Sequence, residues 1–132
     1  MSRLQRLPPL FRTETEVKGT VALVSFFGDL DLRSFEECER TLHALEVRIR
    51  HLILDLRGLS LVDATGLRMV LRAHMRAEVG TWRLTVVGGV RVIEELLAVH
   101  GLLDFHSIRR KIDWAETADG LFPPRPAAHQ TA

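Results

Sequence analysis

The fold class of this chain is decided by residues 52–67, Leu-Ile-Leu-Asp-Leu-Arg-Gly-Leu-Ser-Leu-Val-Asp-Ala-Thr-Gly-Leu. The stretch begins with a short, nearly continuous apolar run, Leu52 to Leu56, which is typical of a central strand covered on both faces. Arg57-Gly58 bounds this run. Asp63 is a good N-cap for a helix that we expect to continue to Val79 and to end at Gly80. A buried strand that leads through a short loop into a helix indicates a βαβ unit.

The residues before this stretch predict a hairpin and a helix. Val17 to Phe27 is rich in β-branched and aromatic residues and predicts a strand, with a weaker partner strand at Phe11 to Val17. Gly28 to Asp31 then interrupts the strand, and Ser34 to Glu37 has the pattern of a capping box that opens a helix. One apolar stripe follows on this helix: Phe35, Cys38, Leu42, Leu45 and Ile49. On the helix after Asp63, the residues expected to face inward are Leu67, Val70, Leu71 and Met75.

The residues after Gly80 continue the alternation of strands and helices. They predict a strand over Trp82 to Val87, a helix over Val90 to His100, an edge strand over Leu103 to Ile108 and a last helix over Asp113 to Ala118. From residue 120 to residue 132 the chain is rich in proline and has no periodicity, so we expect a disordered tail there. Strands that alternate with helices place the chain in the α/β class, with helices packed on a mixed sheet.

Length and composition limit the functions that the chain can have. With 132 residues, 18 basic and 17 acidic side chains and therefore a net charge of +1, it has the size of one domain and lacks the basic excess of a nucleic-acid-binding protein. Its single cysteine, Cys38, cannot form an internal disulfide. No apolar run approaches the roughly 20 residues that span a membrane, and the N-terminus has no signal-peptide pattern. We therefore expect a cytoplasmic protein that does not insert into membranes.

Motifs for catalysis or cofactor binding are missing from the sequence. No two of the six histidines stand four residues apart, so no helix face presents a pair of metal ligands. Gly88-Gly89 follows a predicted strand, but neither a dinucleotide-binding motif nor a phosphate loop surrounds it. We expect no catalytic residue, no metal and no cofactor, and so no enzyme.

The start of the helix after Asp63 is the candidate site. The Asp63 carboxylate can accept from the free N–H groups of the first turn, and Ala64 and Thr65 lie at the positive end of the helix. Hydroxyl groups at this place are natural phosphate acceptors. The alternative is a plain capped helix start.

Two groups of charged residues lie near this helix start in the sequence. Arg68, Arg72 and Arg76 stand four apart and form one row, which is either a solvated face or a patch for an acidic partner. Asp29 and Asp31 could act as a pair of acid and base groups, but a role in a turn and a helix cap fits them better.

The sequence resembles the STAS domain of bacterial anti-sigma factor antagonists over roughly residues 10 to 119, which leaves residues 1–9 as an N-terminal tail. The resemblance rests on four elements that occur in the family's order: Gly28-Asp29-Leu30-Asp31; Leu54-Asp55-Leu56 with Val62-Asp63-Ala64-Thr65-Gly66-Leu67; Leu84-Thr85-Val86-Val87-Gly88; and Leu96-Leu97-Ala98-Val99-His100-Gly101-Leu102. It implies a four- or five-stranded mixed sheet flanked by about four helices. It also implies a partner-switching protein that binds an anti-sigma factor of the histidine-kinase ATPase fold and so frees a sigma factor.

In that family the kinase ends the interaction by phosphorylating a serine or threonine directly after the aspartate. Here that position is Ala64, which has no hydroxyl, and Thr65 follows it. Successive helical residues point about 100° apart, so Thr65 does not simply replace the acceptor. The resemblance implies binding without phosphorylation control, through a surface made of Asp29, Asp31, Asp63, Ala64, Thr65, Arg68 and Arg72. A homodimer is compatible with it.

The fold is open to two other functions. STAS domains also occur as cytosolic subunits of membrane transport complexes, where they brace an ATPase. A small enzyme or a nucleotide-binding protein is the third alternative, for which the chain shows neither a catalytic pair nor a phosphate loop.

Overall fold

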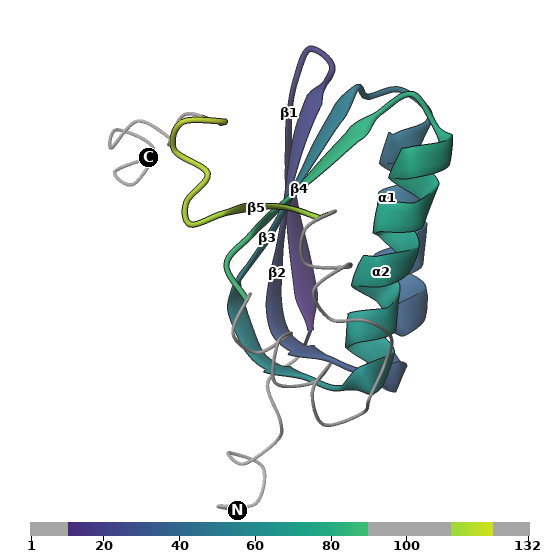
Figure 1. The fold of residues 1–132 in the computed structure, drawn as a ribbon. Coiled ribbons are helices and arrows are strands. Elements are labelled where there is room, and N and C mark those ends of the chain that lie inside the picture. Colours follow the sequence, from purple (N-terminus) through teal and green to yellow (C-terminus); the bar gives the residue numbers. More distant parts are fainter. Residues whose placement is uncertain (1–10, 90–111, 123–132) are drawn as a thin grey trace, which may run out of the picture.

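The protein folds around one five-stranded mixed sheet (Figure 1). The computed structural model describes residues 11–89 and 112–122. In these ranges the elements are β1 (Arg12–Lys18), β2 (Val21–Leu30), the 3₁₀ helix η2 (Leu32–Ser34), α1 (Phe35–Glu46), β3 (His51–Val62), α2 (Ala64–Val79), β4 (Arg83–Val87) and β5 (Asp113–Ala115). The strands lie side by side in sequence order, with β1 antiparallel to β2 and the other neighbours parallel. The predicted α/β class and the predicted mixed sheet of four or five strands are confirmed. Of the roughly four predicted helices, two α-helices lie in the described residues.

The hairpin of β1 and β2 forms where the sequence predicts it, but β2 is longer than expected. The two strands turn at Gly19, whose φ of 60° suits glycine, and Lys18 pairs with Val21. Gly28 to Asp31 does not end the strand, because Asp29 and Leu30 still pair with Leu61 and Val62 of β3. The register shifts between Gly28 and Asp29, where Gly28 has a φ of 95°, so the glycine lets the strand bend and continue.

Strand β3 is the centre of the sheet, as its apolar run predicts. Its first half, Leu52 to Leu56, is buried, because α1 and α2 cover one face and other parts of the chain cover the opposite face. The strand continues beyond Arg57-Gly58 to Val62, so the expected short loop is part of the strand. A side chain at Gly58 would collide with the ring of Phe27, which explains how β2 and β3 pass so closely at this irregular register.

Helix α1 begins differently from the predicted capping box. Asp31, with extended backbone, caps η2 by accepting from the Arg33 N–H, and the Ser34 hydroxyl accepts from the Asp31 N–H at 3.0 Å. Ser34 is thus the last residue of a capping box, and its side chain does not cap α1. The stripe from Phe35 to Ile49 faces the sheet as predicted. Cys38 lies within it, and burial raises the pKa of its thiol.

Helix α2 follows its N-cap Asp63 and ends at Val79, as predicted, but its buried face differs at one position. Leu67 and Val70 are buried, and Leu71 packs partly against the same core. Met75 points outward and is 62% exposed, because Met69 and Ala73 fill the interior instead. None of the described helices is long and apolar enough to span a membrane.

The segment predicted as a last helix, Asp113 to Ala118, begins as strand β5. Its first three residues pair with Thr85 to Val87 of β4. Trp114 packs against the core on the helix side of the sheet, whereas the Asp113 carboxylate accepts hydrogen bonds from Thr85 and Arg83. Pairing with β4 therefore decides the structure of this segment and overrides its helical propensity. The helix predicted at 90–100 and the edge strand predicted at 103–108 lie outside the described residues.

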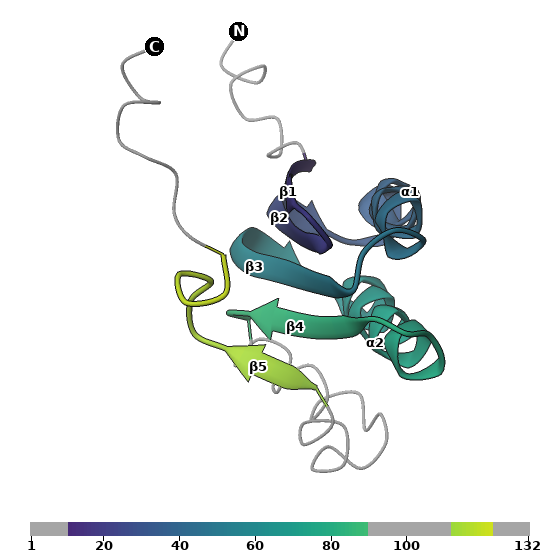
Figure 2. The same ribbon diagram turned by 90° about the horizontal axis from the view of Figure 1, so that it is seen from above.

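Two hydrophobic cores cover the two faces of the sheet. The larger lies between the sheet and the helices α1 and α2, which sit on the same face (Figure 2). The smaller lies on the opposite face and joins Ile53 and Val87 to Ala118 and Phe122. Residues 120–122 belong to the segment for which we predict a disordered tail, but they continue a turn and end at the buried Phe122. The rest of the predicted tails, 1–9 and 123–132, lies outside the described residues.

Candidate functional site

The candidate site lies where β2 and β3 end and where η2 and α2 begin. The two strands are parallel, so their carboxyl ends meet at one edge of the sheet. The chain leaves β2 through Asp31 and leaves β3 through Asp63, and the Asp63 N–H donates to the Leu30 carbonyl at 3.2 Å. This hydrogen bond joins the two places where the chain leaves the sheet, at the ends of β2 and β3. The sheet therefore brings together the two acidic motifs, which are more than thirty residues apart in the sequence.

Asp63 holds the first turn of α2. Its backbone is extended, its carboxylate accepts from the Gly66 N–H at 3.0 Å, and its carbonyl accepts from the Leu67 N–H at 2.9 Å. These bonds fix Ala64 and Thr65 as the first two helical residues, both half-buried. The predicted cap is confirmed, and its carboxylate adds negative charge at the positive helix end.

Gly66 brings this first turn directly against β2. The residue is buried, and a Cβ atom there would collide with the carbonyl oxygen of Leu30 and lie 2.8 Å from the Leu30 Cγ. A larger residue would push the start of α2 away from the strand. The glycine after Thr65 therefore sets the distance between the two halves of the site.

A charged cluster forms the β2 side of the site. Arg33 donates from Nη2 to the Asp31 carboxylate at 2.7 Å, and the same atom lies 3.7 Å from Asp29. The hydrogen bond from Arg33 lowers the pKa of Asp31. Ser34 donates from its hydroxyl to the Asp29 carbonyl at 2.9 Å. Both aspartates thus hold a turn and a cap together, which supports that interpretation over an acid and base pair.

A model of one protein family matches residues 12–115, most of the chain: the STAS domain. The chain belongs to the STAS domain family.

Solved structures agree with this assignment at the level of the fold. An anti-sigma factor antagonist from Mycobacterium paratuberculosis matches with a TM-score of 0.67 and 18% identity, over 84% of this chain and 90% of that one. The anti-sigma factor antagonist SpoIIAA of Bacillus, in its unphosphorylated form, matches with a TM-score of 0.63 and 15% identity, over 85% of this chain and 93% of that one. A serine-to-glutamate variant of RsbS from Moorella thermoacetica matches with a TM-score of 0.65 and 22% identity, over 83% of this chain and 92% of that one.

Two exposed leucines flank the start of α2 in this STAS domain. Leu32 in η2 is 73% exposed, and Leu61 at the end of β3 is 52% exposed. Large apolar side chains at the edge of a charged cluster are typical of a protein-binding surface. The sequence gives no signal for either leucine, because apolar residues are normally expected at buried positions. Arg33 has only one signal in the sequence, its place two residues after Asp31.

The row of three arginines on α2 does not form one solvated face. Arg68 is exposed, and Arg72 is half-exposed beside Glu39, with its guanidinium 5.8 Å from the Phe35 ring. Arg76 lies between the helices, where it donates to Glu46 at 2.8 Å. Residues four apart on a helix rotate by about 40°, which turns the row from solvent toward α1. A patch for an acidic partner could therefore include Arg68 and Arg72 but not Arg76.

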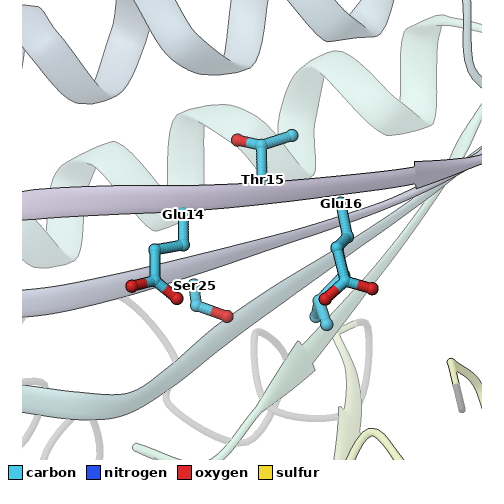
Figure 3. Close-up of a pocket in the computed structure, with 5 residues that line it drawn as sticks. Glu14, Thr15, Glu16 and Ser25 are labelled. Carbon is cyan, nitrogen blue, oxygen red and sulfur yellow. The ribbon is translucent and has the colours of Figure 1, made fainter. Parts of the chain in front are cut away.

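Other clusters in the described part of the chain lack the geometry of a catalytic or metal site. No group of three or more metal-ligating side chains occurs among the described residues. A depression of about 170 Å³ lies on β1 and β2, and Figure 3 shows Glu14 and Glu16 on its side of β1 while Thr15 points away from them. Figure 3 shows both carboxylates on the side of β1 that faces away from the helices. The charged and apolar surface around Asp63 is therefore the better candidate.

Proposed function

We propose that this STAS protein is an anti-sigma factor antagonist. It would bind an anti-sigma factor of the histidine-kinase ATPase fold and so free a sigma factor, without catalysis and without a cofactor. Membership of the STAS family supports the proposal, as do three structural neighbours that are described as anti-sigma factor antagonists or are related to them by fold. The proposal implies a cytoplasmic protein.

The partner would dock on the surface around the start of α2. Its centre would be Asp63, Ala64 and Thr65, with Asp29 and Asp31 on one side and Arg68 and Arg72 along the helix. The exposed side chains of Leu32 and Leu61 support this placement, since they would bury apolar area in the complex. The charges around them would orient the partner.

One observation carries the regulatory part of the proposal: the position directly after the Asp63 cap holds Ala64, which has no hydroxyl. A kinase that phosphorylates this position in relatives would find no acceptor. Thr65 is the next residue on the helix and points in a different direction. The surface would therefore stay open to its partner, and the interaction would be constitutive.

The test uses the anti-sigma kinase that the chain captures from its native cell. Incubation of the wild-type chain with this kinase and ATP should add no phosphate, whereas Ala64→Ser should gain one phosphate at residue 64. Thr65→Ala is the matched control and, like the wild type, should gain no phosphate. Mass spectrometry that finds phosphothreonine at residue 65 of the wild-type chain would contradict the proposal. Capture of transporter subunits in place of a kinase would support the alternative, a STAS subunit of a transport complex.

A further inference from the structure

A short segment after β5 covers the face of the sheet that α1 and α2 leave open. Residues 116–122, called the strap below, leave the edge strand β5 and turn back over the sheet on the side opposite the helices (Figure 2). The STAS family model ends at residue 115, so the strap lies outside the part of the chain that matches the family.

The strap is held mainly by one aromatic side chain. Phe122 is 3% exposed and packs with Ala118 against Ile53 and Val87, both fully buried. Val21 and Leu23 of β2 pack against this place, called the seat of Phe122 below, and stay partly exposed. The seat therefore lies at the border of the smaller core.

Two cationic side chains stand beside the strap. The Lys18 Nζ lies 5.3 Å from the centroid of the Phe122 ring, a favourable cation–π distance. Arg57, which donates to Asp55 at 2.8 Å, also feels the negative charge of Asp119 in the strap. The two cations thus face Asp119 and Phe122, an acidic and an aromatic residue that are three positions apart in the sequence.

Backbone hydrogen bonds contribute little to the attachment of the strap to the sheet. Gly88 donates to the Ala115 carbonyl at 3.1 Å, just before the strap begins. Leu121 and Phe122 both donate to the Ala118 carbonyl, at 3.0 and 2.6 Å, so these bonds stay within the strap. Among the described residues the strap forms no strand with the sheet. Its side chains therefore supply most of the attachment.

We propose that the seat of Phe122 is a second protein-binding surface, which takes a segment of a partner that forms a similar turn and carries an aromatic residue three positions after an acidic one. The strap is the chain's own copy of such a segment and keeps the surface covered. A partner segment must compete with it, so the apparent affinity falls by the fraction of molecules with an open strap. This proposal is independent of the surface at the start of α2.

The test measures binding of a synthetic peptide with the strap sequence, Glu-Thr-Ala-Asp-Gly-Leu-Phe, to the full chain. Phe122→Ala empties the seat, and Leu121→Ala, a change at the more exposed neighbour, is the matched control. The peptide should bind Phe122→Ala about tenfold more tightly than it binds the wild type or Leu121→Ala, because no ring competes. A peptide with alanine in place of its phenylalanine should not bind. Equal affinity for all three chains, or no binding to a Phe122→Ala chain with a wild-type circular dichroism spectrum, would overturn the proposal.

A second measurement on the wild-type chain decides the matter if Phe122→Ala does not fold. The amides of Leu121 and Phe122 are protected by the Ala118 carbonyl, and hydrogen exchange reports their release. A large excess of the peptide should displace the strap and speed the exchange of these two amides, whereas the alanine peptide should not. Exchange that stays unchanged at millimolar peptide would overturn the proposal.

Discussion

Replacement of Gly66 by alanine sets two physical effects against each other. Helix propensity alone predicts a gain of about 0.5–1 kcal/mol, because alanine loses less backbone entropy than glycine. The structure predicts a loss, because the new Cβ would collide with the Leu30 carbonyl oxygen and lie 2.8 Å from the Leu30 Cγ. The oxygen belongs to the backbone of β2 and cannot rotate away. Either the first turn of α2 or the end of β2 must move.

The expected result is a net loss of stability. Overpacking of this kind costs about 1–3 kcal/mol, and a weakened bond from the Asp63 N–H to the Leu30 carbonyl adds up to about 1 kcal/mol. After the propensity gain, we expect the free energy of unfolding of Gly66→Ala to fall by about 1–3 kcal/mol. Urea denaturation followed by circular dichroism measures this change.

Gly120→Ala is the matched control, because a Cβ atom at Gly120 would meet nothing within 4 Å. We expect its free energy of unfolding to stay within about 0.5 kcal/mol of wild type. If Gly66→Ala were as stable as wild type or more stable, helix propensity would outweigh the contact. Gly66 would then not set the distance between α2 and β2.

Three further predictions concern the charged and buried groups. Burial lowers the pKa of His51, and the nearby Arg83 charge lowers it further, so protonation of this histidine favours the unfolded state. The midpoint of urea denaturation should therefore fall as the pH drops below about 6.5, and it should fall less in His51→Gln. Arg76→Ala leaves Glu46 without its cation and should lower the free energy of unfolding by about 1–3 kcal/mol, because the pair is only partly buried. Arg68→Ala, the control, should change the free energy of unfolding by less than about 0.5 kcal/mol. Cys38 should react with a thiol-specific reagent only when the chain unfolds, because the side chain is buried and its pKa is raised; fast labelling of the folded chain would contradict this.

Much of the fold could be predicted because some signals in the sequence are local. The apolar run Leu52 to Leu56 is buried on both faces, as its composition indicates, and Asp63 caps the next helix. The hairpin turn next to Lys18 has the glycine that its positive φ requires. In each case the residues that fix the structure stand next to one another in the chain.

The errors arose where distant contacts decide the structure. The segment from Asp113 forms a strand because it pairs with β4, some thirty residues earlier, and no local pattern shows this. Met75 has the right spacing for the inner face of α2, but Ala73 lies deeper. Ser34 has the sequence of a helix cap, yet Asp31 takes that role one turn earlier.

The candidate site could be predicted only in part. Its acidic residues and Ala64 stand in a recognisable motif, and the capping role of Asp63 follows from its position. The contact of Gly66 with Leu30 and the exposure of Leu61 depend on how α2 meets the ends of two strands. These features could not be derived from the residues beside them.

The central claim, that the partner binds at the start of α2, is tested most directly by the affinity of Ala64→Glu for the anti-sigma factor. A glutamate in the first helical turn suits the helix dipole, so the variant should fold, with circular dichroism as the check. Its charge would lie unpaired in the interface, and we expect binding to weaken by at least about a hundredfold, or about 2.7 kcal/mol. Ala64→Ser, which adds one oxygen and no charge, should stay within about threefold of wild type, a difference of about 0.7 kcal/mol. Equal affinities of folded Ala64→Glu and wild type would contradict the account.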